Sequence, residues 1–380
     1  MLIVADENMP LVESLFSDFG TIVRKPGRNL TADDVANADA LLVRSVTQVN
    51  SQLLENSRVK FVGTATIGVD HIDQDYLKAQ GIGFSHAPGC NANSVVDYVL
   101  SALMCICEED ERHFRQLSVG VIGAGNVGGR LISRLKKLGL EVVAYDPYVS
   151  EADCELVDLN RVLECDVVSL HVPITQDGEY PTHHMISMDQ LDSMNDKGIL
   201  INSSRGSVVD NIALKSHLVK NAGFKAVLDV WEQEPEIDRD LLDLVDIATS
   251  HIAGYSLDGK YNGTFQVYQA LCKHFGLPAR KRLAQMLPEP EILYVGVSPE
   301  CQLEPILNRL VHVAYDIRRD DRALRRAVAR TDDIPAAFDR LRKHYPVRRE
   351  FSSLSVKVRK KDLDNTPALE AIGFKVKAKS

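Results

Sequence analysis

Short apolar runs alternate with amphipathic segments along most of the chain. This alternation is typical of parallel strands connected by helices. In the first part of the chain the apolar runs predict strands at Leu2–Ala5, Thr21–Arg24, Ala40–Val43, Phe61–Gly63 and Gly83–Ser85. A helix is expected over Met9–Phe16, and Thr31 is placed to cap another. These residues predict one open α/β unit.

A second α/β unit is expected after a long helix. Ser94 and Asp97 have the spacing of a capping box, and apolar residues from Val95 to Met104 recur at helical spacing. Strands are then predicted at Ser118–Ile122, Val142–Tyr145, Val167–Leu170, Ile199–Asn202 and Ala226–Leu228. A further helix over about 257–275 would return the chain to the first unit, so the second unit would be an insertion within the first.

The C-terminal part has a different pattern. Strands are expected at 291–295 and 354–358, with one helix starting near Pro305 and another over 334–344. This predicts a small α+β module, bordered by the proline-rich segment 287–291. We therefore expect three domains, formed by 1–93 with about 255–286, by 94–254, and by 287–380.

The charge of the chain is unevenly distributed. Its formal net charge is −9, which argues against a dedicated nucleic-acid-binding protein. Residues 301–380 nevertheless hold 19 Lys or Arg and only 11 Asp or Glu. Positive residues concentrate near the middle of this tail, at Arg340, Arg342, Lys343, His344, Arg348 and Arg349. The tail has the composition of a separate domain and contains a candidate site for an anion.

The sequence predicts neither a membrane span nor a metal site. The apolar stretch Val95–Ile106 is interrupted by Asp97 and Ser101, and the first residues lack the basic region of a secretory signal. The seven cysteines form no CxxC pair, and no group of Cys and His has the spacing of a zinc site. We therefore expect a cytoplasmic protein with free thiols, no metal, and neither a membrane nor a nucleic acid as a partner.

A glycine-rich turn has the pattern of a dinucleotide-binding site. The segment 123–128 reads GAGNVG, follows an apolar strand and opens a helical pattern, and Asp146 ends the next strand 18 residues later. In this setting the glycines permit the tight turn, the approach of a pyrophosphate and close helix packing. The residues expected to contact the cofactor here are Gly123, Gly125, Asn126, Val127 and Gly128. The carboxylate of Asp146 would bind ribose hydroxyls and repel a 2′-phosphate, which predicts NAD rather than NADP.

Five more segments complete a family resemblance. They are 60–73, 171–173, 201–206, 228–235 and 250–254, which read KFVGTATIGVDHID, HVP, INSSRG, LDVWEQEP and SHIAG. With these motifs in this order, residues 1–280 resemble the D-2-hydroxyacid dehydrogenases. The resemblance implies an α/β protein with two open parallel-sheet domains, Rossmann-like or flavodoxin-like, and a cleft between them. It also implies NAD as the cofactor and hydride transfer at a 2-hydroxy acid.

The resemblance assigns catalytic roles to Arg205, Glu234 and His251. A guanidinium binds a substrate carboxylate through two parallel hydrogen bonds and polarises the oxygen on C2. The histidine takes the hydroxyl proton as the hydride leaves. A carboxylate hydrogen-bonded to the histidine fixes its tautomer and stabilises its protonated form. The three residue types therefore suit the oxidation of a 2-hydroxy acid.

The resemblance also extends to residues that bind the ligands. For the cofactor it adds Asp146, Thr175, Ser204, Asp229 and Gly254. For the substrate it gives Ser45, Thr66, Arg205 and Tyr255. The loop Thr64–Gly68 is expected to present its backbone amides to the substrate carboxylate, as small backbone nests do for other anions.

Two departures from the family pattern narrow the interpretation. The arm that builds the dimer in most members is reduced to Arg112–Leu117, and the basic tail is added. This combination resembles a branch of the family that oxidises a small phosphorylated 2-hydroxy acid and forms a homodimer through its C-terminal domain. The apolar stripe Leu307–Ile317 is then expected to face the partner subunit. Arg348 and Arg349 are the expected contacts for the substrate phosphate.

Two alternatives remain open at this point. One is a dehydrogenase of the phosphoglycerate type, from which the catalytic triad does not distinguish the chain. The other is a non-enzymatic NAD-sensing protein on the same fold. The complete triad, Arg205, Glu234 and His251, speaks against the second alternative.

Overall fold

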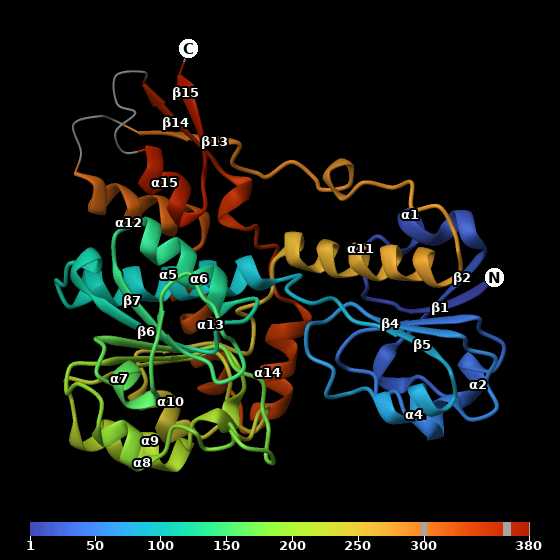
Figure 1. Ribbon diagram of the computed structural model, residues 1–380, viewed down its shortest axis with the longest axis horizontal. Coiled ribbons are helices and arrows are strands. Elements are labelled where there is room, and N and C mark those ends of the chain that lie inside the picture. Colours follow the sequence, from blue (N-terminus) through green and yellow to red (C-terminus); the bar gives the residue numbers. More distant parts are fainter. Residues whose placement is uncertain (298–301, 360–365, 380) are drawn as a thin grey trace. The chain divides into compact units, whose positions relative to one another are not determined.

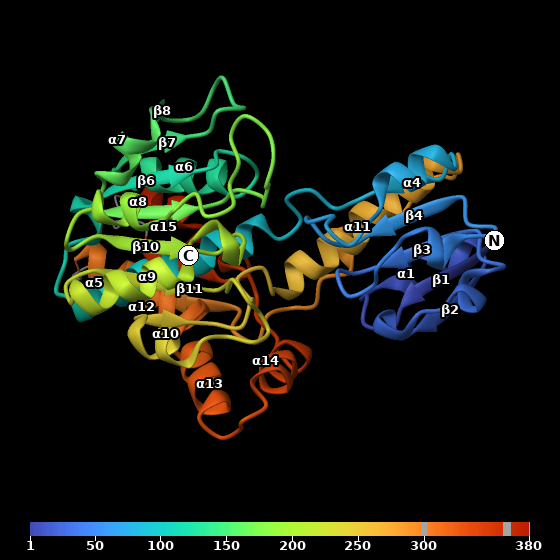
Figure 2. The same cartoon turned by 90° about the horizontal axis from the view of Figure 1, so that it is seen from below.

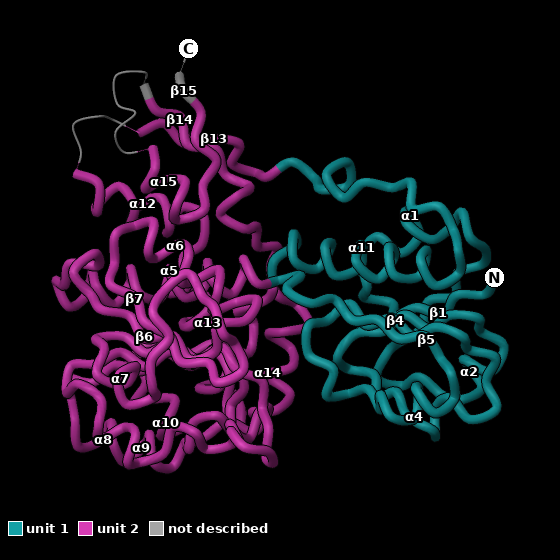
Figure 3. Tube along the Cα trace, viewed as in Figure 1, with its two compact units in different colours: residues 1–91, 256–289 teal, residues 92–255, 290–380 magenta. Residues whose placement is uncertain are grey.

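The computed structural model describes residues 1–297, 302–359 and 366–379 (Figure 1). It belongs to the α/β class and contains three sheets of parallel strands, two large and one small. The chain forms two compact units (Figure 3). Unit 1 contains residues 1–91 and 256–289, and unit 2 contains residues 92–255 and 290–380. The expected assignment of three domains to three functions stays a prediction.

Unit 1 is built on a five-stranded sheet in the order β2-β1-β3-β4-β5. Its strands are β1 (Leu2–Asp6), β2 (Thr21–Lys25), β3 (Ala40–Val43), β4 (Phe61–Thr64) and β5 (Gly83–Ser85). Helices α1 (Val12–Phe16) and α11 (Leu257–His274) cover one face, and α2 (Ala32–Val35), α3 (Ser51–Leu54) and α4 (Gln74–Ala79) cover the other (Figure 1). Successive strand residues alternate between these two cores, as Ile3 and Val4 do. The return of α11 to the first sheet confirms the predicted insertion of one unit within the other.

Unit 2 contains a seven-stranded sheet in the order β12-β11-β10-β9-β6-β7-β8. Its strands are β6 (Ser118–Ile122), β7 (Glu141–Tyr145), β8 (Glu155–Leu156), β9 (Val167–Leu170), β10 (Ile199–Asn202), β11 (Lys225–Leu228) and β12 (Ile247–Ala248). The strand order reverses at β6, which lies between β7 and β9. In open α/β sheets, ligands bind beyond the carboxyl ends of the strands at such a switch point. The glycine turn 123–128 directly follows β6.

The C-terminal segment contributes helices to both faces of this sheet. One face is covered by α5 (Ala92–Glu109) and α6 (Gly128–Lys137), on which α12 (Leu303–Ala314) and α15 (Thr366–Ile372) form a second layer. The other is covered by α7 (Leu159–Leu163), α8 (Met188–Asp192), α9 (Asn211–Lys220), α10 (Arg239–Leu244), α13 (Arg318–Val328) and α14 (Ile334–Lys343) (Figure 2). A small sheet in the order β13-β14-β15 contains β13 (Tyr294–Gly296), β14 (Ser355–Arg359) and β15 (Lys375–Lys379).

The predicted capping box at the start of α5 is wrong. The helix begins at Ala92, so Ser94 lies within its first turn, and its hydroxyl donates to Glu350 at 3.1 Å. Asp97 is 1% exposed and accepts hydrogen bonds from Arg134 at 2.6 Å and from the Phe351 N–H at 2.8 Å. Both side chains bind other elements of unit 2 instead of capping α5.

The apolar stripe Leu307–Ile317 is covered within its own chain. Leu307, Val311 and Ile317 are fully buried and belong to the same core as α5 and α6. The expectation that this stripe faces a partner subunit is therefore wrong. The stripe is buried within its own chain because it covers α5. That helix is apolar on nearly all sides and therefore needs a second layer of helix over it.

Two further observations concern the composition. In the described ranges 1–297, 302–359 and 366–379, no helix is long and apolar enough to cross a membrane. The cysteines within these ranges are free thiols, and all except Cys154 are buried. Cys301 lies outside the described residues.

Candidate active site

His251 and Glu234 form a hydrogen-bonded pair beyond the carboxyl ends of β11 and β12. His251 Nδ1 lies 2.5 Å from Glu234 Oε1. The backbone of His251 has φ +56°, a left-handed conformation that is costly for a histidine. A hydrogen bond from its N–H to the Asp229 carbonyl at 2.7 Å holds this conformation. Because Nδ1 is bound to the carboxylate, Nε2 is the ring nitrogen left to exchange a proton with a ligand.

The environment of Glu234 keeps its carboxylate ionised. Its second oxygen, Oε2, accepts from the Trp231 N–H at 3.1 Å. Burial of the side chain opposes ionisation, but the hydrogen bond and charge of His251, the Trp231 N–H and the charge of Arg342 outweigh it. Together they hold the pKa of Glu234 below its usual value. An ionised Glu234 stabilises a positive charge on the His251 ring.

Asp229 holds the loop that carries His251. It is 1% exposed, and its carboxylate accepts from the Ile252 N–H at 2.7 Å, the Ala253 N–H at 2.9 Å and the Thr249 hydroxyl at 2.6 Å. Thr249 belongs to none of the sequence motifs. These contacts show that Asp229 positions the loop that carries His251, and its expected contact with the cofactor stays a prediction.

Arg205 lies in a turn that Asn202 organises at the end of β10. Asn202 Oδ1 accepts from the N–H of Ser204 at 3.1 Å and from its hydroxyl at 2.9 Å, and Asn202 Nδ2 donates to the Arg205 carbonyl at 2.9 Å. The Arg205 guanidinium donates to the Ser204 carbonyl at 2.9 Å. Sequence reasoning missed Asn202, although an Asn followed by two serines after a buried strand is a turn signal. Arg205, Glu234 and His251 thus follow the neighbouring strands β10, β11 and β12.

The glycine turn has the geometry that a dinucleotide requires. Gly123 has φ +93°, and a Cβ there would lie 2.6 Å from the His171 carbonyl oxygen. A Cβ on Gly128 would lie 1.8 Å from the Gly123 carbonyl oxygen, whereas a Cβ on Gly125 would meet nothing within 4 Å. Gly123 and Gly128 are therefore required by the fold, and Gly125 leaves open space for a ligand at the start of α6.

Asp146 lies beside this turn, directly after β7. Its carboxylate accepts from the Ala124 N–H at 2.9 Å and from the Tyr148 N–H at 3.0 Å. Each oxygen keeps a lone pair for a ribose hydroxyl. In the same turn, Asn126 is exposed and Val127 half-buried. The observed arrangement fits NAD.

Two other predicted cofactor residues lie in loops of unit 2. Thr175 is exposed, and its N–H donates to the Thr182 hydroxyl at 2.8 Å, which closes the loop between them. Gly254 is half-buried and follows Ala253 in the catalytic loop. Their contacts with the cofactor stay predictions.

The predicted substrate residues of unit 1 follow strands of its own sheet. Ser45 is exposed and comes two residues after β3. Thr66 comes after β4, its hydroxyl donates to the Gly68 carbonyl at 2.9 Å, and it lies 2.7 Å from the Thr64 hydroxyl. In the described part of the chain, the N–H groups of Ile67 and Gly68 have no acceptor. This loop therefore offers the backbone donors that were expected for an anion.

Arg348 is not available to bind a substrate phosphate. It is 4% exposed, and its guanidinium donates to the Ala253 carbonyl at 2.5 Å and to the Ser94 carbonyl at 3.3 Å. It also lies 4.3 Å from the centre of the Tyr315 ring. The prediction for Arg348 is therefore wrong. Its guanidinium is held by these hydrogen bonds and by stacking on Tyr315, and it fixes the loop after His251.

One cluster contains residue types that bind metals. Ligand atoms of His183, His184 and Glu232 lie within 4.8 Å of one another. His184 Nε2 lies 2.5 Å from Glu232, and His184 Nδ1 lies 3.8 Å from Asp210. Contacts with these two carboxylates account for the position of His184, and the expected absence of a metal stays a prediction.

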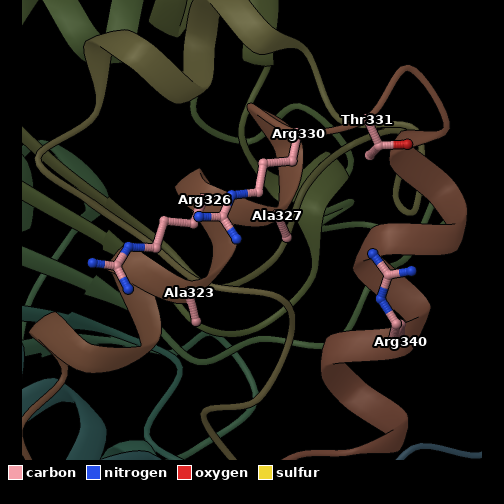
Figure 4. A pocket seen from close by; sticks show the side chains of 6 residues that line it. All are labelled: Ala323, Arg326, Ala327, Arg330, Thr331 and Arg340. Atoms are coloured by element: carbon pink, nitrogen blue, oxygen red, sulfur yellow. The ribbon is translucent and has the colours of Figure 1, made fainter.

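A pocket of about 290 Å³ lies apart from these residues, between α13 and α14. It is lined by Ala323, Arg326, Ala327, Arg330, Thr331 and Arg340. Arg326 extends from α13, Arg330 from the turn that follows it, and Arg340 from α14 (Figure 4). Arg340 of the basic cluster lines this pocket, whereas the residues predicted for catalysis and for the cofactor do not.

Comparison with known proteins agrees with this arrangement. Residues 107–253 match the family model described as D-isomer specific 2-hydroxyacid dehydrogenase, NAD binding domain. Residues 286–373 match a domain of unknown function, DUF3410. The structure of a D-lactate dehydrogenase from Aquifex aeolicus, complexed with NAD and lactic acid, is similar with a TM-score of 0.60 and 27% identity. That similarity covers 72% of this chain and 95% of the other.

The similarity extends over the full chain in curated relatives. An erythronate-4-phosphate dehydrogenase of Marinobacter nauticus is 50% identical, over 99% of this chain and 100% of its own. One from Pectobacterium carotovorum is 48% identical, over 98% of each chain. The chain therefore belongs to the erythronate-4-phosphate dehydrogenase family, within the NAD-dependent D-2-hydroxyacid dehydrogenases.

Proposed function

We propose that the protein oxidises 4-phospho-D-erythronate to 3-hydroxy-2-oxo-4-phosphobutanoate with NAD, as a step in pyridoxal 5′-phosphate biosynthesis. The observation that carries this proposal is the His251–Glu234 pair, in which Nδ1 lies 2.5 Å from Oε1. This pair, Arg205 and the glycine turn all come after strands of the same seven-stranded parallel sheet. The names of the full-length relatives support the choice of substrate.

The reaction removes a hydride from C2 and a proton from its hydroxyl group. When bound, NAD accepts the hydride. His251 Nε2 takes the hydroxyl proton, because Nδ1 is held by Glu234. The ionised Glu234 then stabilises the positive ring. Arg205 binds the substrate carboxylate and polarises the oxygen on C2.

The other predicted residues bind and orient the two ligands. Asp146 and the glycine turn hold the adenosine half of NAD, and Thr175, Ser204, Asp229 and Gly254 border the remaining part. Ser45, the Thr66 loop and Tyr255 contact the substrate. The donors of the Thr66 loop and the hydrogen-bond capacity of Asp146 support these assignments.

Formation of NADH tests the proposal against its alternatives. With NAD present, 4-phosphoerythronate is expected to be oxidised with a kcat/KM at least about 10² times that for 3-phosphoglycerate. A higher kcat/KM for 3-phosphoglycerate would instead assign the protein to the phosphoglycerate type. NAD binding with no turnover of either acid would favour a dinucleotide sensor.

We further propose a cytoplasmic homodimer with three functional domains. These are a substrate-binding lid of residues 1–93 and about 255–286, an NAD-binding domain of 94–254, and a dimerisation domain of 287–380. Ile292, Leu293 and Tyr294 are 48–55% exposed at or next to the edge strand β13, and such an apolar edge favours a protein partner. Sedimentation should show a dimer that Leu293→Lys weakens; a monomeric wild-type protein would reject the assembly.

A further inference from the structure

The last turn of α14 lies near the catalytic pair of its own chain. Ile334 and Phe338 of this helix are buried against the sheet of unit 2, which fixes the position of the helix. Four residues after Phe338, the Arg342 guanidinium carbon lies 5.8 Å from the centre of the Tyr255 ring. The Tyr345 ring packs edge-on against the same tyrosine, with 5.8 Å between ring centres. Tyr255 therefore lies in contact with two residues of the basic tail.

The charge of Arg342 acts on the active site, and one of its donors has no partner. The guanidinium hydrogen-bonds the Tyr255 side chain and interacts electrostatically with Glu234 and Asp339. Its Nε is buried and has no hydrogen-bond partner. A buried donor without a partner is costly. This free energy favours the binding of an anion.

Arg342 is also placed differently from Arg348 and Arg340 of the basic cluster. Arg348 already donates to two backbone carbonyls. Arg340 is exposed and lines the pocket between α13 and α14. The phosphate of a four-carbon substrate is only a few bonds from C2, so the group that recognises it must lie close to His251. Arg342 meets this condition, because its guanidinium carbon lies 5.8 Å from the ring centre of Tyr255, four residues after His251.

We propose that Arg342 is a specificity-determining residue that binds the phosphate group of the substrate within the same protomer. This inference rests on the proposed function. A guanidinium offers two parallel donors to two phosphate oxygens, and charge-assisted bonds of this kind are stronger than neutral ones. The buried Nε is a donor that lacks a partner. Tyr255, held by Arg342 and Tyr345, faces the same ligand.

The test compares phosphorylated and unphosphorylated substrate in three variants of the full-length protein. Arg342→Gln should lower kcat/KM for 4-phosphoerythronate roughly 10–100-fold and change kcat/KM for erythronate less than about 3-fold. Arg342→Lys should recover part of the loss, because an ammonium keeps the charge but not the fork. Arg340→Gln removes a charge from the same helix and should change neither value. Titration of NAD, followed by the fluorescence of Trp231, checks that each variant is folded.

Each remaining outcome has a defined meaning. Equal losses on both substrates would show that Arg342 acts only through Glu234, and unchanged kinetics would show that it has no role; either result overturns the inference. A wild-type protein that does not prefer 4-phosphoerythronate over erythronate would overturn the proposed function as well. That failure is recognised before any variant is measured.

Discussion

Replacing Glu234 with glutamine removes a carboxylate that accepts two hydrogen bonds, one on each oxygen. Oε1 accepts from His251 Nδ1 at 2.5 Å and Oε2 accepts from the Trp231 N–H at 3.1 Å. A glutamine has one oxygen, so it can accept only one of these bonds. If its oxygen faces Trp231, its NH₂ group faces His251 and favours the tautomer with the proton on Nε2, which cannot take a proton from the substrate.

The size of the effect follows from these contacts. A hydrogen bond that involves a charged group contributes about 1.5–3 kcal/mol, equivalent to roughly 10–100-fold in rate at 1.4 kcal/mol per decade. The unfavourable tautomer adds to this loss, so kcat for Glu234→Gln should fall roughly 10²–10⁴-fold, within the usual range for a positioned acid–base group. Loss of the negative charge also makes the protonated ring less stable. The acidic limb of the pH–rate profile should therefore move to lower pH.

Steady-state NADH formation over a range of pH measures both effects. Glu236→Gln is the matched control, because Glu236 is exposed two residues away and loses the same charge. NAD affinity should be unchanged in both variants. A kcat for Glu234→Gln within about 3-fold of wild type would refute the role of the pair, as would a loss of equal size in Glu236→Gln.

Two further predictions concern the cofactor and the pH dependence of stability. Wild type should have a higher kcat/KM with NAD than with NADP. Asp146→Ser should lower the ratio of these two values roughly 10–100-fold, because it removes the charge that repels a 2′-phosphate. An unchanged NAD-to-NADP ratio would contradict the role of Asp146. Burial lowers the pKa of His171 from 6.5 to about 3, so the unfolded chain binds a proton there that the folded protein does not. Stability should therefore fall as pH drops from 6.5 toward 3, and between pH 7 and 5 His171→Gln should reduce this fall by about 1–2 kcal/mol in urea unfolding. Equal losses in both proteins would show that His171 is not the group responsible.

The sequence predicts the central strands well because their pattern has a simple physical origin. Strands β3 and β9 were predicted to the residue, and every residue in both is buried. A parallel strand covered by helices on both faces is a continuous apolar run, which is visible without an alignment. Strands β8 and β12 were missed because each has two residues, too few to form a period. Helix α13 was missed because arginines dominate it and only a narrow side of it is buried.

The sequence proposes residue types for the candidate site but does not reveal the contacts that support them. Motifs identify Glu234 and His251, whereas the bond from the Trp231 N–H to Glu234 comes from the backbone, which every residue possesses. The basic tail shows the same limit. Arg342 and Arg348 are equivalent in the sequence, yet the Arg342 guanidinium lies beside the Tyr255 ring and the Arg348 guanidinium is bound to two carbonyls. Arg342 lies in the last turn of α14 and Arg348 lies after the helix, so the orientation of α14 decides which groups each guanidinium meets. Composition does not reveal that orientation.

The contribution of the C-terminal segment to both faces of the seven-stranded sheet has a consequence for protein synthesis. The strands β6 to β12 leave the ribosome before α12, α13, α14 and α15 exist. During this interval the side of α5 that Leu307 and Val311 will cover is exposed to water, and the Ala253 carbonyl lacks the guanidinium of Arg348. Nascent chains that expose such apolar surface are prone to aggregation. The unit that contains the glycine turn therefore completes its folding only after translation of residues 290–380.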